Sequence, residues 1–360
     1  MEVTQYDLVV AGGGPAGAAA AITAARAGFR VLLLDRGRFP RHKVCGEFVS
    51  AESIALLCDL LGSGQSSLLA PGPRTVETRV FVDGVVTRLP IAPAASISRY
   101  ELDAALWQAA KGAGAECHQE IAVRGIARRN GGFAITSLNS SWNARAVIDA
   151  TGRWSNLRPA PKSPNGPLWL GLKAHYISLE SDDSTTDLYF FDGGYCGVQP
   201  FGNRTLNVCA MIRSDAATEL PDVFPLHPAL QARSQNWTQI TDAIATAPLM
   251  FQTPTPVAEG ILRAGDSGAF IDPFVGDGIS IALRSGVLAA ESLAPFFSRQ
   301  STFDQAVRAY ESEYHRRFAG PLRTARRLRS LLDAPVTLRR LAVQAMQIPA
   351  VAEYVVSHTR

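Results

Sequence analysis

The chain has 360 residues, which is long for one ordinary core and favours two closely packed lobes. With 47% hydrophobic and 19% charged residues it is not a disordered chain, and a net charge of +3 is too small to make nucleic acid its main partner. No run of about 18 strongly apolar residues and no secretory signal are visible, and the five cysteines are odd in number and scattered. We therefore expect a cytoplasmic protein with reduced thiols and no transmembrane segment.

The amino-terminal pattern is that of a strand, a glycine-rich turn and a helix. An apolar run over 6–10 is followed by Gly12-Gly13-Gly14-Pro15-Ala16-Gly17, and a second apolar run over 30–34 ends at Asp35. In such a pattern Gly12 permits the tight turn, Gly14 lets the backbone approach a pyrophosphate, and Gly17 lets the helix pack closely on the strand. Asp35 falls where a carboxylate can accept hydrogen bonds from both ribose hydroxyls. The pattern predicts a dinucleotide site and leaves FAD and NAD(P) open.

The following segments alternate between strands and helices. A basic loop over 38–47 precedes a predicted hairpin over 75–90 that turns at Asp83-Gly84. Ser98 is placed to cap a helix that runs towards residue 112. A second hairpin is expected to turn at 130–132, and an apolar strand over 146–148 leads into Asp149-Ala150-Thr151-Gly152.

The second half begins with a predicted sheet over 168–211, with turns at Gly193-Gly194 and Gly202-Asn203. A strand over 261–266 ends in an acid, and 272–279 leads into a long helix to about residue 293. Everything after 302 is expected to be helical, with a break at Gly320-Pro321 and a proline at Pro335.

Together these stretches resemble the FAD-dependent oxidoreductases of the para-hydroxybenzoate hydroxylase type, and among them the branch with the geranylgeranyl reductases. The resemblance rests on 12–17 with Asp35, Lys43-Val44-Cys45-Gly46, 99–103, 150–152 and 265–278. It implies an α/β (α+β two-lobed) fold with a Rossmann-like FAD-binding lobe, a mixed β-sheet substrate lobe and C-terminal helices. The lobes are expected to be 1–75, 93–164 and 256–300 for FAD, 76–92 and 165–255 for the substrate, and 301–360 for the helical region.

The resemblance implies FAD as the cofactor and NAD(P)H or another reductant as a transient electron donor. Asp35 would bind the adenosine ribose, Arg99 would lie near the pyrophosphate or ribityl chain, and Asp266 would bind the ribityl or phosphate region. The backbone N–H groups of 276–279 would face the flavin pyrimidine edge, where a helix amino terminus stabilises negative charge. Asp277 would oppose that charge and is assigned no catalytic role. The full expected cofactor-binding set is Gly12, Gly14, Pro15, Ala16, Gly17, Asp35, Arg36, Cys45, Gly46, Arg99, Thr151, Gly152, Gly265, Asp266, Gly276, Gly278 and Ile279.

Cys45 is the candidate catalytic side chain, because in the reductase branch the Cys-Gly loop lies beside flavin and substrate. The alternative is a small apolar filler in a tight turn. Arg41, His42 and Lys43 could activate the thiol, or could form a solvated basic loop. The six histidines show no metal-ligand spacing, so no metal site is expected.

Two departures from the resembling families concern the substrate wall. Geranylgeranyl reductases carry Tyr-x-Trp-x-Phe-Pro, whereas this chain has Gly197 and Gln199 at the tryptophan and phenylalanine positions. Flavin-dependent halogenases carry Trp-x-Trp, and none of the five tryptophans here lie two apart. Lys173 and His175 share one face of a predicted strand; an exposed sheet face is expected, with the wall of the pocket as the alternative. The arginines from Arg316 to Arg340 are expected to form solvated helix faces, with a peripheral membrane or an acidic partner as the alternative.

The leading functional expectation is a monooxygenase that hydroxylates a small aromatic or polyketide-like molecule. The alternative is a carbon–carbon double-bond reductase similar to geranylgeranyl reductases, and a third is a non-catalytic FAD-binding module. Oxygen use separates these hypotheses. The sequence leaves the substrate and the oligomeric state open.

Overall fold

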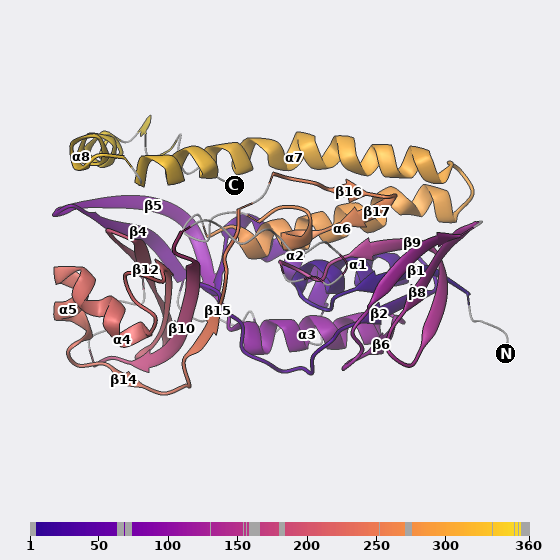
Figure 1. Cartoon of the computed structure of the whole chain (residues 1–360), viewed down its shortest axis with the longest axis horizontal. Helices are drawn as coiled ribbons and strands as arrows, with labels where there is room; N and C mark the ends of the chain where they lie inside the picture. Colours follow the sequence, from indigo (N-terminus) through magenta and orange to yellow (C-terminus); the bar gives the residue numbers. More distant parts are fainter. Residues whose placement is uncertain are drawn as a thin grey trace.

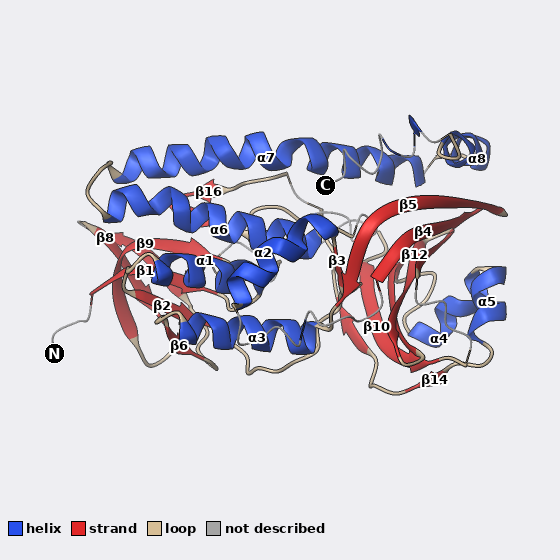
Figure 2. Ribbon diagram, turned by 180° about the vertical axis from the view of Figure 1, so that it is seen from behind, coloured by secondary structure: helices blue, strands red, loops and turns tan. Residues whose placement is uncertain are grey.

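The structure is a computed structural model that describes residues 5–62, 68, 74–129, 131–153, 155, 157, 166–179, 184–251, 253–270, 276–332, 334–348, 350–351 and 353. Two sheets stand side by side, and two long helices run along one edge of the molecule (Figures 1 and 2). This arrangement confirms the α/β class with a mixed second sheet. Asn130 and the stretch 272–275, which carry parts of the sequence predictions, lie outside the described residues.

The first sheet has the order β16-β17-β9-β1-β2-β6, with β8 pairing β9 and β7 pairing β8. The neighbours from β17 to β6 are all parallel, as the strand–helix–strand pattern requires. Its strands are β1 (Gln5–Ala11), β2 (Val31–Leu34), β6 (Glu116–His118), β7 (Gly125–Arg129), β8 (Gly132–Thr136), β9 (Ser141–Asp149), β16 (Val257–Ala258) and β17 (Ile261–Arg263).

This sheet is buried on both faces, which explains why its central strands are continuous apolar runs. Leu8 and Val10 of β1 pack in the core formed with helices α1 (Pro15–Arg26), α3 (Arg99–Gly112) and α6 (Gly278–Phe297). The alternate residue Val9 packs on the other face against the β7–β8 hairpin. The carboxyl ends of β1 and β9 and the amino end of α1 therefore meet at one edge of the sheet, where a nucleotide can bind.

The second sheet has the order β14-β10-β13-β12-β11-β4-β5-β3, and β15 also pairs β10. All its described pairs are antiparallel except β4 with β11, so the sheet is mixed. Its strands are β3 (Phe48–Val49), β4 (Arg74–Val82), β5 (Val85–Ser96), β10 (Trp169–Ile177), β11 (Thr185–Phe191), β12 (Gly194–Gly202), β13 (Thr205–Arg213), β14 (Thr238–Gln239) and β15 (Ile244–Thr246). Helices α4 (Leu220–Val223) and α5 (Pro228–Ser234) cover its outer face.

Several local predictions are confirmed. The hairpin of β4 and β5 turns at Asp83-Gly84, and the Ser98 hydroxyl accepts the Tyr100 N–H at the start of α3. The turn expected at Gly193-Gly194 falls one residue earlier, and the turn expected at Gly202-Asn203 falls one residue later. The reason is that Gly194 and Gly202 are the first and last residues of β12. Asp266 does not end a strand, since β17 stops at Arg263 and a short 3-10 helix spans Gly265–Ser267.

The expected break at Gly320-Pro321 is wrong. Helix α7 runs from Phe303 to Leu332 through both residues. A proline inside a helix removes one hydrogen bond and crowds the preceding turn. Phe318 and Leu322, which flank the proline, are both buried in the core shared with α6, and this packing keeps the helix continuous. The break comes instead at Pro335, which precedes α8 (Val336–Ala345).

The strands largely follow the lobes expected from the sequence. All strands of the first sheet fall inside the segments expected for the FAD lobe. In the second sheet, β3, the first two residues of β4 and the end of β5 after residue 92 come from those same segments. The remaining helix, α2 (Ala51–Leu61), packs on α6. The residue boundaries of the lobes stay a prediction.

One helix among the described residues, α6, is long and apolar enough to cross a membrane by length and composition alone. Its most apolar window is 61% buried inside the protein. Gly286 of α6 lies so close to α1 that a Cβ there would be 2.1 Å from the Ala16 carbonyl oxygen. This tight contact identifies α6 as a core helix of the first lobe.

Candidate functional site

A cavity of about 650 Å³ lies between the first sheet's carboxyl edge and the inner face of the second sheet. Every residue of the expected cofactor-binding set lines it except Gly17. The cavity therefore joins the glycine turn, the basic loop, the start of α3, the segment after β9 and the start of α6. That these residues bind FAD stays a prediction at this point; their convergence on one cavity is a finding.

The glycine turn divides its work between packing and ligand access. Gly12 has a φ of +106°, and a Cβ on Gly17 would lie 1.8 Å from the Gly12 carbonyl oxygen, so Gly17 serves the close helix–strand packing. At Gly14 a Cβ would meet nothing closer than Arg99 Nη2 at 3.9 Å. Gly14 is also the N-cap of α1 and carries no side-chain cap. An open approach to an uncapped helix amino terminus beside a guanidinium fits a pyrophosphate, which is the part of FAD expected there.

Asp35 is surrounded by donors from its own lobe. Its Oδ2 accepts the Gly13 N–H at 2.7 Å and its Oδ1 accepts the Gly37 N–H at 2.7 Å. Arg41 donates to both oxygens, at 2.7 and 3.0 Å, with its guanidinium over the Phe39 ring. Each carboxylate oxygen of Asp35 therefore already accepts two hydrogen bonds. The direct contact of Asp35 with a ribose stays a prediction, and both Asp35 and Arg41 line the cavity.

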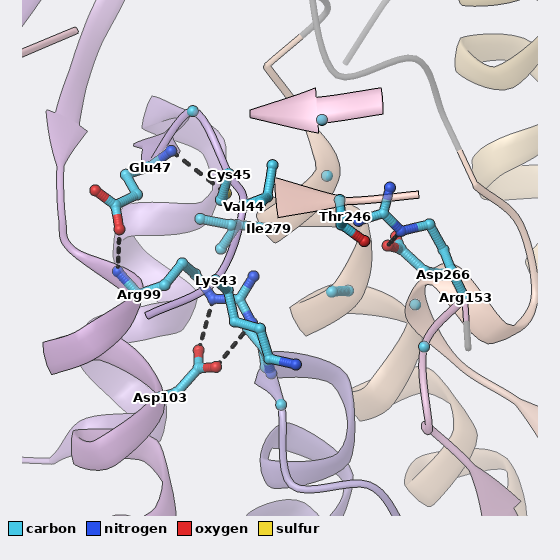
Figure 3. Close-up of a pocket in the computed structure, with 18 of the residues that line it drawn as sticks. Lys43, Val44, Cys45, Glu47, Arg99, Asp103, Arg153, Thr246, Asp266 and Ile279 are labelled. Atoms are coloured by element: carbon cyan, nitrogen blue, oxygen red, sulfur yellow. Dashed lines mark hydrogen bonds and ion pairs between the residues drawn. The ribbon is translucent and has the colours of Figure 1, made fainter. Parts of the chain in front are cut away.

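Arg99 and Lys43 supply positive charge to the same part of the cavity. Arg99 donates two 2.7 Å hydrogen bonds to the buried carboxylate of Asp103, one turn further along α3 (Figure 3). Burial lowers the pKa of Arg99, but Asp103 outweighs it and the net direction is upward. Burial, with Arg41, Arg99 and Arg36 nearby, lowers the pKa of Lys43 to about 8. A bound pyrophosphate would offset the repulsion between Lys43 and these arginines.

The Cys45 thiol lies on the cavity wall (Figure 3). Its Sγ accepts the Glu47 backbone N–H at 3.3 Å, and the Arg99 side chain lies near enough for Cys45 to contribute to the raised pKa of Arg99. The Cys45 carbonyl accepts the Asn207 side-chain N–H at 3.1 Å, which ties this loop to β13. The thiol is therefore held between the cofactor loop, α3 and the substrate sheet, and it faces space that a substrate can enter.

Glu47 is a buried hub that the sequence analysis did not single out. It is 0% exposed and has a φ of +57°. One carboxylate oxygen accepts the Arg99 N–H at 2.8 Å and a hydrogen bond from Lys173, and the other pairs with His175 Nε2 at 2.8 Å. Burial raises the pKa of Glu47, but His175 and Lys173 overcome it and hold it below its usual value. The cluster joins the cofactor loop to β10.

The expectation of an exposed face for Lys173 and His175 is wrong. They are 1% and 8% exposed and lie behind the cavity wall. Their alternation on β10 was visible in the sequence, but a charged pair on one strand face reads as exposed unless the counter-charge is known. That counter-charge, Glu47, comes from a loop 126 residues earlier in the chain. The one local signal was an acid placed directly after the Cys-Gly pair.

A network of polar groups shapes the wall beyond β9. Thr151 donates its N–H and its hydroxyl to Asp149 Oδ1, at 3.0 and 2.5 Å. Ser267 donates to the same oxygen at 3.1 Å and accepts the Gly152 N–H at 2.9 Å. Asp149 thus fixes the segments that carry Thr151, Gly152 and Asp266 against one another.

Asp266 and the amino end of α6 complete the cofactor side. Asp266 is paired with Arg153 at 3.5 Å across the cavity from Cys45 (Figure 3). Gly276 has a φ of +76°, and a Cβ on Gly278 would meet nothing within 4 Å. Asp277 is buried and accepts a 3.1 Å hydrogen bond from the Ser50 hydroxyl of the segment before α2. The open N–H groups at the start of α6 fit a site for the anionic edge of a flavin.

The substrate side of the cavity is mostly apolar. Val44, Leu188, Met211, Ile244, Leu249 and Phe270 line it. Gly197 and Gln199 of β12 also line it, at the positions where the resembling reductases carry large aromatic residues. The Gln199 amide is held by Thr186, Thr75 and Ser96, so this polar group is satisfied within the wall. The result is a wide apolar chamber with one polar strip.

Comparisons with known proteins agree with this geometry. Residues 7–51 and 68–271 match two family models, each described as FAD dependent oxidoreductase, and the second spans more than half of the chain. The chain is 26% identical over 340 residues to digeranylgeranylglycerophospholipid reductase 1 of Methanococcoides burtonii, covering 88% of this chain and 81% of that protein. It is 27% identical to menaquinone reductase of Mycobacterium tuberculosis, covering 98% and 92%.

The fold has a close match among solved structures. A flavin-dependent brominase superposes with a TM-score of 0.81 at 20% identity, covering 99% of this chain and 93% of that one. At this identity the likeness shows the fold alone. The family models span the nucleotide turn and the substrate sheet, whose residues meet at one cavity. The chain therefore belongs to the FAD dependent oxidoreductases.

Proposed function

We propose that this FAD-dependent oxidoreductase reduces a carbon–carbon double bond in an extended, mostly apolar substrate. The observation that carries the proposal is Cys45: a thiol on the wall of the cavity, whose Sγ accepts the Glu47 N–H and whose carbonyl accepts the Asn207 side-chain N–H. The names of two relatives, one acting on a digeranylgeranylglycerophospholipid and one on menaquinone, support this choice over the hydroxylation placed first by the sequence.

The residues present fit each step that the protein must perform. When bound, FAD supplies the two-electron chemistry. Gly14, Arg99 and Lys43 would hold its pyrophosphate, and the N–H groups at the start of α6 would face the flavin ring. Leu188, Met211 and Leu249 would hold the apolar chain and exclude water. Of the two carbons of the double bond, one would take a hydride and the other would take a proton from Cys45. NAD(P)H or another reductant would then reduce the cofactor again.

The test uses two probes, menaquinone and an unsaturated archaeal phospholipid. FAD-loaded protein reduced with dithionite is incubated with each probe without oxygen, and the products are weighed by mass spectrometry. We expect at least one probe to gain two hydrogen atoms in its unsaturated chain; menaquinone is reoxidised in air before the mass is measured, because dithionite alone adds two hydrogen atoms to the quinone ring. Cys45→Ala should lose this activity while retaining FAD and its melting temperature, and Cys58→Ala, an exposed thiol on α2, is the matched control.

Hydroxylation is the second candidate. It is favoured by the polar strip at Gln199 and by the widened wall at Gly197, which suit an oxygen-bearing ring better than a plain polyprenyl chain. Under air, a monooxygenase would consume oxygen and add one oxygen atom to the substrate. A product with added oxygen and no anaerobic hydrogen gain would replace the proposed reduction by hydroxylation. Loss of FAD binding from the purified chain would contradict both.

A further inference from the structure

The short helix α8 carries an apolar face that nothing in the described part of the chain covers. Leu338 and Leu341 are 54% and 62% exposed. They lie three residues apart, so they share one side of the helix. Val343 and Arg339 hold the opposite side: Val343 is buried, and Arg339 pairs with Asp83 at 2.9 Å. The helix is therefore fixed in its rotation, with its leucines directed outwards.

The carboxy-terminal helices are rich in arginine, and one of these, Arg339, is paired with Asp83 and Asp192. From residue 316 to 350 the sequence contains eight arginines and a single acid, Asp333. Arg323, Arg326 and Arg327 on α7 and Arg340 on α8 are exposed. Helix α8 lies beyond the carboxyl end of α7, at the same outer edge of the molecule, in both views (Figures 1 and 2). Leu338, Leu341 and these four arginines form what we call the carboxy-terminal surface.

The carboxy-terminal surface is also close to the substrate chamber. Val343 and Met346, on the inner side of this region, pack in one apolar cluster with Met211 and Leu249, and both of the latter line the cavity. The Thr87 hydroxyl of β5 donates to the Val343 carbonyl at 3.1 Å. Helix α8 thus lies between the chamber wall and the outside of the protein.

We propose that the carboxy-terminal surface binds an anionic lipid bilayer. Exposed leucines on one helix face can enter the boundary between headgroups and acyl chains, and arginines beside them are attracted to anionic headgroups. An acidic protein partner would use the arginines, but it would give no reason for two leucines directed away from the protein. The inference stands on α8 and α7, and it does not depend on which reaction the cavity performs.

The test measures binding of the FAD-loaded full chain to vesicles of phosphatidylcholine alone or mixed with phosphatidylglycerol. We expect binding to the mixed vesicles, weakened by salt. Leu338→Ser with Leu341→Ser should lower the partition coefficient by about tenfold or more. Arg326→Gln with Arg327→Gln should lower binding to the mixed vesicles by about tenfold, with little effect on the neutral ones.

Leu138→Ser is the matched control, because Leu138 is 72% exposed on the turn between β8 and β9, away from α8. It should bind vesicles like the unmodified chain. All these positions are exposed, so melting temperatures should agree and a folding defect is directly visible. The proposal is overturned if the unmodified chain does not bind mixed vesicles, or if the double leucine variant binds as well as the control. A dimer that this variant converts to a monomer, without vesicle binding, would instead assign the surface to a second copy of the chain.

Discussion

At the scale of single residues, the site depends on charges that come from distant parts of the sequence. Glu47 meets Lys173 and His175, and Arg99 meets Asp103 within one helix. A buried ion pair is not in itself a large source of stability, because desolvation opposes the attraction, but removing one partner leaves an uncompensated buried charge. The cluster holds Glu47 in place, and the Glu47 backbone N–H in turn donates to the Cys45 thiol.

Glu47→Gln tests that cluster. It should lower the free energy of unfolding by about 3–5 kcal/mol, because the Lys173 ammonium loses its carboxylate while staying buried. Glu47→Gln combined with Lys173→Met should recover a large part of the loss, since the buried ammonium is removed together with its carboxylate. Urea unfolding of the three proteins at neutral pH provides the measurement. If the single and double variants are equally destabilised, the ion pair is not the cause.

We expect Lys43 to make FAD binding depend on pH. Its pKa is lowered to about 8 by burial and by Arg41, Arg99 and Arg36, so above pH 8 the cofactor-free protein loses this charge. A bound pyrophosphate favours the charged amine and raises its pKa. The contribution of Lys43 to affinity is therefore complete below pH 8 and is lost as the pH rises from 8 towards the bound-state pKa.

Fluorescence titrations with FAD between neutral and alkaline pH measure this effect. The unmodified chain should lose affinity above pH 8, and Lys43→Met should bind more weakly but with a flatter profile over the same range. Lys111→Met, on the last turn of α3, is the control and should keep the pH dependence. Equal profiles for the chain and for Lys43→Met would remove Lys43 from the phosphate site.

At the scale of elements, the glycine turn shows how one motif serves both folding and binding. Gly17 has no room for a side chain, because a Cβ would lie 1.8 Å from the Gly12 oxygen. Gly14 has room for one in the protein, but only in the space expected for the pyrophosphate. The two glycines are three residues apart and should respond to substitution in different ways.

Gly17→Ala should lower the free energy of unfolding by about 1–3 kcal/mol, the usual range for forcing an extra carbon into a packed contact. Gly14→Val should leave the melting temperature of the FAD-free protein nearly unchanged and should strongly weaken FAD binding. Thermal melts without FAD and equilibrium dialysis with FAD separate the two effects. A Gly14→Val protein with full FAD occupancy would show that Gly14 is only a turn residue.

The elements also show how far sequence patterns reach. The strand–turn–helix unit with Gly12, Gly14 and Gly17 was predictable because its signals are local and each glycine has its own steric reason. The unbroken α7 was not, because the burial of Phe318 and Leu322 around Pro321 depends on α6, which local propensity does not describe. Glu47 and its partners were missed for the same reason, since their pairing is tertiary.

At the scale of the whole molecule, the cavity is shared by both lobes, so cofactor binding should stabilise them together. A ligand that binds only the folded protein adds stability according to its concentration relative to its Kd, by about 2.7 kcal/mol at a hundredfold excess. We expect one unfolding transition that moves upwards with added FAD, followed in parallel by tryptophan fluorescence and circular dichroism. Two transitions, of which FAD shifts only one, would show that the lobes unfold independently.

Helix α7 restricts the motions by which substrate and product can enter and leave the cavity. Its 30 residues make it about 45 Å long. Tyr310 and Phe318 pack in the core of the first lobe. Towards the other end, Arg329 lies over the rings of Trp169 and Phe251 in the second lobe. Because this continuous helix packs on both lobes, it opposes a hinge motion that would separate them. We expect substrate and product to pass by displacement of loops at the rim while the frame stays rigid.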